Sequence, residues 1–422
     1  MNVIRLQAKF IVVSSERILH PGQIVVQRGR VVEVTQRTDA RPDIDLGEVA
    51  LLPSLVNCHT HLEFSDLRHP LPAGDNFPAW IGAVVRYRDA RQAQISDLIE
   101  TGLQECFLSG TSLVGDIVTQ PWLPSRLATN PTFSGETAWC EHLGPVAEPR
   151  VVAMTEVLGL TVDRFRSTVA WAEACRATDA SQSARIEEIG ISPHAPYSLL
   201  QPLASEFLQQ LDPEVITAMH VAESQEERQW TEAGEGPFAT AFERLGIPLP
   251  SQRMQINEAI DLLKRQRRSL LIHGNYLTPR EMDQLAQAQN VSVVYCPRTH
   301  QHFGHAPYPW RELQSRNIRV VLGTDSLASN PDLQLWRELV TARQQHSELS
   351  ATTALAAVTE QGAMALGRQH DHGSLNVGKL AYMNVVTTPA ELKPVDLLEH
   401  LTTNDCQPRP LALSRLARGL SN

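Results

Sequence analysis

Eight short apolar runs recur along the middle of the 422-residue chain, and longer amphipathic stretches lie between them. Such runs are typical of buried parallel strands, and the stretches have the apolar spacing of helices that cover a sheet. Eight strand-then-helix units over about 320 residues predict a (β/α)8 barrel, the TIM-barrel fold. A doubly wound sheet is the alternative, but no G-x-G-x-x-G follows the first run. The runs read ALLPSLV, TSLVGDI, VVAMTEVLG, IEEIGISP, VITAMHVAES, SLLIHGN, VSVVYCP and IRVVLGTD.

The two ends of the chain differ from its middle, because both are rich in β-branched runs broken by turn residues. KFIVVS and QIVVQRGRVVEV lie near the start, and residues 372–386 repeat the pattern. We therefore expect residues 1–50 plus 372–422 to form one small β-sandwich domain. Residues 51–371 are then the barrel. Within it, the Pro-rich residues 119–150 predict a long loop or insertion.

Charge and cysteine usage limit the kinds of partner. The formal net charge of -10 argues against nucleic acid and against an anionic membrane surface, and leaves a small-molecule substrate. Six scattered cysteines form no C-x-x-C pair and no disulfide framework, which favours a cytoplasmic location. No apolar run approaches the roughly 18 residues of a membrane-spanning helix.

Polar residues collect where the apolar runs end. In barrel enzymes the carboxyl ends of the strands meet at one mouth, where the catalytic residues lie. One histidine at a strand end is unremarkable in a chain with 15 histidines, but a set of five with an aspartate favours a common site. The residues are His59 and His61 after the first run, His194 after the fourth, His220 and Glu223 at the fifth, His273 at the sixth and Asp325 at the eighth.

Four of these residues suit a metal ion. His59 and His61 lie one residue apart on an extended segment, so both side chains can point into the barrel mouth. Alone, this pair is equally consistent with a solvated surface feature or with two core histidines. With His220 and Asp325, however, it offers three imidazoles and a carboxylate, which suit one Zn²⁺, or alternatively Fe²⁺, with a position left for water. Such a metal lowers the pKa of its water toward ~7 and supplies hydroxide.

Three residues are candidates for proton transfer and polarisation. Glu223 can carry a proton to the leaving group, His273 can hydrogen-bond the developing oxygen, and Asp325 can take a proton from the water. No lysine ends the fourth run, which argues against a binuclear site bridged by a carbamylated lysine. No G-x-S-x-G elbow is present for a serine nucleophile either.

Together these residues resemble the amidohydrolase superfamily, in its mononuclear deaminase and chlorohydrolase branch. The resemblance implies His59, His61, His220 and Asp325 as metal ligands. It also implies Glu223 as the proton shuttle and His273 as the polarising residue. The motifs that carry it are VNCHTHLEFS, ISPHAPYS, HVAESQEE, LIHGNYL, CPRTH and LGTDSLASNPDL, over about residues 50–335.

The same resemblance implies several substrate contacts. His194 is expected to touch the substrate, Glu63 to touch its ring, and Trp80 to line the pocket. Relatives usually read CPxSN after the seventh strand, whereas this chain reads CPRTHQHFGH. Arg298 and His300 in this segment are therefore expected to face the substrate, and Arg298 favours an anionic one.

The expected activity is hydrolytic deamination of an aminated N-heterocycle, with aminopurine nucleosides as the first choice of substrate. S-adenosylhomocysteine, methylthioadenosine and aminodeoxyfutalosine deaminases are the most similar kinds of enzyme. The same residues also allow a hydrolytic dechlorinase or a cyclic amidohydrolase. A non-catalytic, metal-bound relative is a more remote alternative. The resemblance allows a homodimer.

Overall fold

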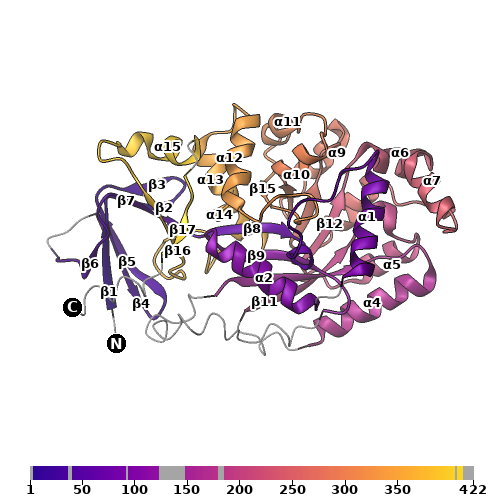
Figure 1. Cartoon of the computed structure of the whole chain (residues 1–422), viewed down its shortest axis with the longest axis horizontal. Helices are drawn as coiled ribbons and strands as arrows, with labels where there is room; N and C mark the ends of the chain where they lie inside the picture. Colours follow the sequence, from indigo (N-terminus) through magenta and orange to yellow (C-terminus); the bar gives the residue numbers. More distant parts are fainter. Residues whose placement is uncertain are drawn as a thin grey trace.

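The computed structural model describes residues 3–36, 40–91, 94–122, 148–178, 185–403 and 406–411. Most of the predicted loop at 119–150 lies outside these residues. Figure 1 shows a barrel of strands ringed by helices, with a smaller β unit beside it. None of the described helices is long and apolar enough to cross a membrane.

The barrel is a sheet of eight parallel strands in chain order, β8 to β15. Each predicted apolar run supplies one strand of the barrel, and the predicted (β/α)8 fold class is confirmed. Side chains on both faces of the sheet are buried, which explains the nearly continuous apolar runs. The strands are β8 (Leu55–Thr60), β9 (Thr111–Val118), β10 (Arg150–Val157), β11 (Ile186–Pro193), β12 (Thr217–Val221), β13 (Ser269–His273), β14 (Val291–Tyr295) and β15 (Val320–Leu322).

Helices connect the strands and cover the outside of the barrel (Figure 1). Their starts are encoded locally: Thr278 and Glu281 form a capping box around Pro279 at the start of α9, and Gln255 and Glu258 form another at α8. The described helices are α1 (Phe77–Ala90), α2 (Ile95–Leu108), α4 (Val162–Arg176), α5 (Leu203–Gln210), α6 (Gln225–Ala233), α7 (Pro237–Arg244), α8 (Ile256–Leu263), α9 (Pro279–Ala286), α10 (Pro297–His302), α11 (Trp310–Ser315), α12 (Leu335–Gln345), α13 (Ala351–Ala357), α14 (Glu360–Ala365) and α15 (Leu397–Thr403).

The small β unit consists of two sheets, in the orders β5-β4-β1-β6 and β17-β16-β7-β2-β3. Apolar side chains of both sheets, such as Ile24 and Leu51, share one core, as in a sandwich. Strands from both ends of the chain pair here, since β16 is antiparallel to β7. The strands are β1 (Val3–Ala8), β2 (Phe10–Ser14), β3 (Arg17–Leu19), β4 (Gly22–Gln27), β5 (Arg30–Gln36), β6 (Ile44–Asp45), β7 (Val49–Pro53), β16 (Met383–Thr387) and β17 (Arg409–Pro410).

The first apolar run is shared between the two units. Its first part is β7 of the small unit and its last part is β8 of the barrel, and Ser54 alone separates them. At the other end of the chain, α15 buries Leu397 and Leu401 in the core of the barrel. From the sequence we expected all of residues 372–422 to lie in the small domain. In the structure, α15 packs against α12 and α13 of the barrel.

The barrel closes where β15 meets β8. The amide of Asp325 donates a hydrogen bond of 3.1 Å to the carbonyl oxygen of His59, and Thr60 pairs with Asp325 in a parallel bridge. Gly323 makes this approach possible, because a Cβ there would lie 2.9 Å from the Cβ of His59. Closure therefore joins the first and last strands directly at two candidate metal ligands.

We expect Gly323→Ala to lower the free energy of unfolding by about 1–3 kcal/mol, because its methyl group would push against the backbone of His59. Denaturant unfolding measures this loss. Gly82→Ala is the matched control: in helix α1 its Cβ would meet only the end of Arg86, at 3.4 Å, so alanine should stabilise by about 0.5–1 kcal/mol. Equal effects of the two changes would contradict the close approach at Gly323.

Candidate active site

The carboxyl ends of the barrel strands bring four histidines and an aspartate together. Two overlapping groups, His59–His220–His273 and His59–His61–Asp325, each have ligand atoms within 4.8 Å of one another. The Nε2 atoms of His61 and His220 are 3.2 Å apart. The Nε2 of His59 is 3.4 Å from Oδ1 of Asp325. Residues from four strands or strand ends thus converge on one point.

The donor set fits a divalent metal ion. Both ring nitrogens of His59 are buried without a hydrogen-bond partner among the described residues. The Nε2 atoms of His61 and His220 face each other, and a neutral imidazole nitrogen is a good ligand atom. Burial lowers the pKa of both imidazoles well below its usual value, so the rings are neutral, the form that binds metals. A metal at this point would satisfy atoms that are otherwise orphaned in the described structure.

The backbone fixes the tautomer of His220. Its Nδ1 lies 2.9 Å from the carbonyl oxygen of His194. A carbonyl oxygen can only accept, so Nδ1 carries the proton and the lone pair of Nε2 faces His61. The end of β11 therefore orients a ligand carried by β12.

Asp116, which the sequence did not assign to the site, holds the segment that carries the first two histidines. Its Oδ1 accepts hydrogen bonds from the amide of Leu62, at 2.9 Å, and from the hydroxyl of Thr60, at 3.0 Å. Asp116 is fully buried near the end of β9, next to β8. A buried carboxyl at a strand end was the available signal, but its partners, a backbone amide and a hydroxyl more than 50 residues earlier, cannot be read from the sequence.

Glu223 and His273 face each other beside the cluster. Oε1 of Glu223 is 3.3 Å from Nε2 of His273. Burial, and then the charges of Asp325 and Glu227, raise the pKa of Glu223 well above its usual value. A carboxyl whose pKa is raised keeps its proton to a higher pH and is better suited to protonate a substrate.

Three residues at this mouth have backbone φ angles in the left-handed region although none is glycine. They are Ala222 at 54°, His273 at 70° and Asp325 at 58°. Such conformations cost of order 1–3 kcal/mol each and persist where the surroundings hold them. Their concentration at strand ends marks this mouth as the functional one.

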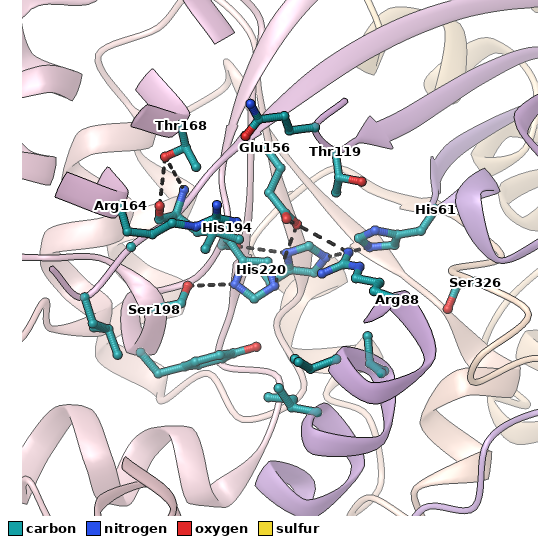
Figure 2. A pocket seen from close by; sticks show the side chains of 18 of the residues that line it. His61, Arg88, Thr119, Glu156, Arg164, Thr168, His194, Ser198, His220 and Ser326 are labelled. Carbon is teal, nitrogen blue, oxygen red and sulfur yellow. Dashed lines mark hydrogen bonds and ion pairs between the residues drawn. The ribbon is translucent and has the colours of Figure 1, made fainter. Parts of the chain in front are cut away.

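A cavity of about 890 Å³ opens over the cluster. His61, His220, Glu223, His273 and Asp325 line it. Figure 2 shows His61 and His220 close to His194 and Arg88 within this cavity. Aromatic side chains line much of the remaining wall, which suits a planar ring. They include Phe64, Phe77, Trp80, Tyr197, Phe238 and Phe242.

Two of the predicted substrate contacts line the cavity. Trp80 stacks on Phe77, with ring centroids 5.6 Å apart. His194 lies 2.7 Å from the hydroxyl of Ser198 through Nδ1, and burial lowers its pKa to about 3. Both positions are compatible with substrate contact, and their role stays a prediction.

Glu63 lies elsewhere than predicted. Its buried carboxylate binds Arg88, at 2.7 Å, and Arg91, and it does not line the cavity. Burial alone would raise the pKa of Glu63, but the two guanidinium groups hold it below the usual value. Its oxygens are thus occupied by cations, and both of these arginines, Arg88 and Arg91, line the cavity.

Arg298 and His300 also lie outside the cavity lining. Arg298 forms a two-point ion pair with Asp332, at 2.7 and 3.0 Å, and lies 3.6 Å from the buried Glu338. His300 packs against Tyr295, with ring centroids 5.6 Å apart. The acidic partners stand 34 and 40 residues further on, so the sequence segment alone could not reveal them.

Comparison with known proteins identifies the family and the fold. Residues 50–411 match the model of the amidohydrolase family. An aminodeoxyfutalosine deaminase of Nitratiruptor sp. is 26% identical over 85% of this chain and 84% of its own length. The solved Helicobacter pylori aminofutalosine deaminase, in complex with methylthio-coformycin, has a TM-score of 0.77 at 20% identity, over 96% and 97% of the two chains. Atrazine chlorohydrolase of Arthrobacter aurescens TC1, complexed with zinc, has a TM-score of 0.69 at 18% identity, over 99% of each chain.

The fold and the site define a barrel hydrolase of the metal-dependent type, and the chain belongs to the amidohydrolase family. The resemblance seen in the sequence is thereby confirmed. The curated relatives also bear out the predicted class of enzyme, a hydrolase that acts on carbon–nitrogen bonds.

We expect Asp116→Ala to weaken metal binding by about 10- to 100-fold, because the segment that carries His59 and His61 loses its hydrogen bonds from Thr60 and Leu62 to Asp116. Asp116→Asn is the matched control, since its amide oxygen can still accept both bonds and should keep most of the affinity. Competition with a chromogenic chelator measures both. Unchanged affinity in the alanine variant would remove Asp116 from this role.

We expect Arg298→Ala to lower the free energy of unfolding by about 2–4 kcal/mol, because it leaves the buried Glu338 without its cation. Arg337→Ala removes a more exposed partner of Asp332, 3.6 Å away, and should cost about 0–1 kcal/mol. Denaturant unfolding measures both. A selective rise in KM for anionic substrates, with stability unchanged, would instead support the substrate contact predicted from the sequence.

Proposed function

We propose that this chain is a zinc-dependent deaminase that removes an exocyclic amine from an aminopurine nucleoside or a similar N-heterocycle. The observation that carries the proposal is the position of Glu223, which lies beside the histidine–aspartate cluster and lines the same aromatic cavity. A metal site, a proton donor and a surface for a planar ring are then available to one substrate.

His59, His61, His220 and Asp325 would hold the metal, and Zn²⁺ suits three imidazoles and a carboxylate. When bound there, it supplies an activated water as the nucleophile. Burial tends to raise the pKa of Asp325, but the imidazole of His59, 3.4 Å away, holds the pKa low, so the carboxylate is able to bind a cation. Ser329 donates to its Oδ2 at 3.0 Å and leaves Oδ1 toward His59.

Glu223 protonates the ring nitrogen next to the carbon under attack, which makes that carbon more electrophilic. His273, 3.3 Å from Glu223, is placed to hydrogen-bond the oxygen that develops on the carbon. The amide of Glu223 donates to Oε2 of Glu227 at 2.7 Å, and Asn275 donates to the carbonyl oxygen of Glu223 at 2.9 Å. These bonds fix the backbone of Glu223 and leave its side chain free to transfer a proton.

A hydrolytic dechlorinase is the second candidate, and a cyclic amidohydrolase is close to it in chemistry. The likeness of fold to the zinc-bound chlorohydrolase favours keeping this alternative. A non-catalytic relative is a weaker reading, because Glu223, His273 and the complete ligand set are all present. A homodimer and a cytoplasmic location remain predictions from the sequence.

Metal analysis combined with a release assay tests the proposal. The zinc-loaded protein is incubated with aminopurine nucleosides, aminopyrimidines, chlorotriazines and cyclic amides, and ammonia, chloride and ring opening are followed separately. Ammonia release from the nucleosides is the expected result. Chloride release alone would favour the dechlorinase, and bound metal without any turnover would favour the non-catalytic relative.

We expect Glu223→Gln to retain bound metal and to lower kcat by about 10²–10⁴-fold, because the amide cannot transfer a proton. Glu232→Gln is the control. Glu232 is exposed near the end of α6, and its replacement should keep the full rate. Metal content and ammonia release are measured on the same samples. Full activity of Glu223→Gln would mean that another group carries the proton.

A further inference from the structure

A pair of opposite charges lines the cavity away from the histidine cluster. Glu156 stands at the end of β10, and its Oε2 is 4.0 Å from Nη2 of Arg88 on helix α1. The same nitrogen of Arg88 is 2.7 Å from Glu63. Figure 2 shows Glu156 between Arg88 and His194, with its carboxyl directed toward them. Arg88 therefore lies beside one oxygen of Glu156 on the cavity wall, at ion-pair distance but not within a hydrogen bond.

The other oxygen of Glu156 has no partner among the described residues. Glu156 is 4% exposed, and its Oε1 is buried without a hydrogen bond. Nε2 of His194 lies 3.9 Å away, which is too long for one. A buried carboxylate oxygen that lacks a donor is costly, and a ligand in the cavity that donates to it removes this cost.

The hydroxyl oxygen of Thr119 is a second buried oxygen without a hydrogen-bond partner among the described residues. Thr119 also lines the cavity. Val118 on β9 is paired in parallel register with Thr155 on β10. Thr119 and Glu156 are the residues that directly follow this pair in the two segments. Neighbouring strands lie about 4.8 Å apart, and side chains at matching positions share a face. The two acceptor oxygens thus come from adjacent points of the wall.

The charges around these oxygens balance. Arg88 and Arg91 carry two positive charges and Glu63 carries one negative charge. Burial raises the pKa of Glu156 to about 7, so Glu156 adds the second negative charge when it is ionised. Arg164 also lines the cavity, but it is exposed, so water screens its charge. A balanced group with two free acceptors suits an uncharged donor, such as a hydroxyl, better than a carboxylate.

We propose that Glu156 and Thr119 form a subsite that accepts hydrogen bonds from neighbouring hydroxyl groups of the substrate, such as those of a ribose, with Arg88 as the positioning residue. This inference rests on the proposed function, because it places the sugar of a nucleoside here while the base faces Glu223. The subsite selects for hydroxylated, uncharged sugar moieties.

The test compares adenosine with 2′,3′-dideoxyadenosine, which lacks the two neighbouring hydroxyls. In the zinc-loaded protein, Glu156→Leu should lower kcat/KM for adenosine by about 10- to 100-fold, mainly through KM, and change it less than about threefold for the dideoxy compound. Glu156→Gln keeps an acceptor oxygen and should fall between wild type and Glu156→Leu. Thr119→Val should show a smaller loss in the same direction.

Glu188→Gln is the matched control. Glu188 is a partly buried strand glutamate that also binds arginines, 2.7 Å from Arg368 and 3.0 Å from Arg268, but it lies near the amino end of β11. The Glu188→Gln variant should keep the wild-type preference for adenosine over 2′,3′-dideoxyadenosine. Thermal unfolding of each variant separates a loss of fold from a loss of binding. Equal losses for both nucleosides in Glu156→Leu and Glu156→Gln would overturn the subsite.

Binding of the products separates this inference from the proposed function. Calorimetry with inosine and 2′,3′-dideoxyinosine measures how much the neighbouring hydroxyls contribute to binding, without any reaction. A preference of wild type for inosine that Glu156→Leu abolishes supports the subsite even if no amine is released. The subsite is wrong if wild type binds the two products equally or binds neither, and ammonia release from other aminated heterocycles would then leave the deaminase proposal standing.

Discussion

The hydrogen bond from the amide of Asp325 to the carbonyl oxygen of His59 is the contact on which the site depends. It closes the barrel between the last strand and the first, and it does so at two candidate metal ligands rather than at apolar residues. A ring of parallel strands has only one carboxyl-end mouth. Once the ring is closed, ligands more than 260 residues apart in the chain face one another.

The fold was predictable because the barrel buries both faces of every strand. Each apolar run in the sequence therefore corresponds to one strand, and its last polar residue corresponds to the mouth. His59, His61, His220, His273 and Asp325 could be assigned in this way without knowledge of any contact. The first run was predicted less well, because one continuous apolar segment serves both β7 and β8. Hydrophobicity does not show at which residue a chain leaves one sheet for another.

Charged residues around the cavity were less predictable, because the role of a charge depends on its partner. Glu63 and Arg298 are each neutralised by residues that are distant in sequence or on another helix. Arg88 and Glu156 line the cavity instead, although neither belongs to a recognisable motif. Asp116 accepts hydrogen bonds from the backbone amide of Leu62 and the hydroxyl of Thr60, and neither contact has a signature in the sequence. Pairwise electrostatics thus decided which of these polar residues line the cavity.

His194 performs two tasks that belong to different parts of the chemistry. Its ring lines the cavity, while its carbonyl oxygen receives the Nδ1 proton of His220. The position of this one residue therefore sets both part of the cavity wall and the tautomer of a candidate metal ligand. Any ligand contact that shifted the backbone of His194 would couple occupancy of the cavity to affinity for the metal, and such a coupling is reciprocal.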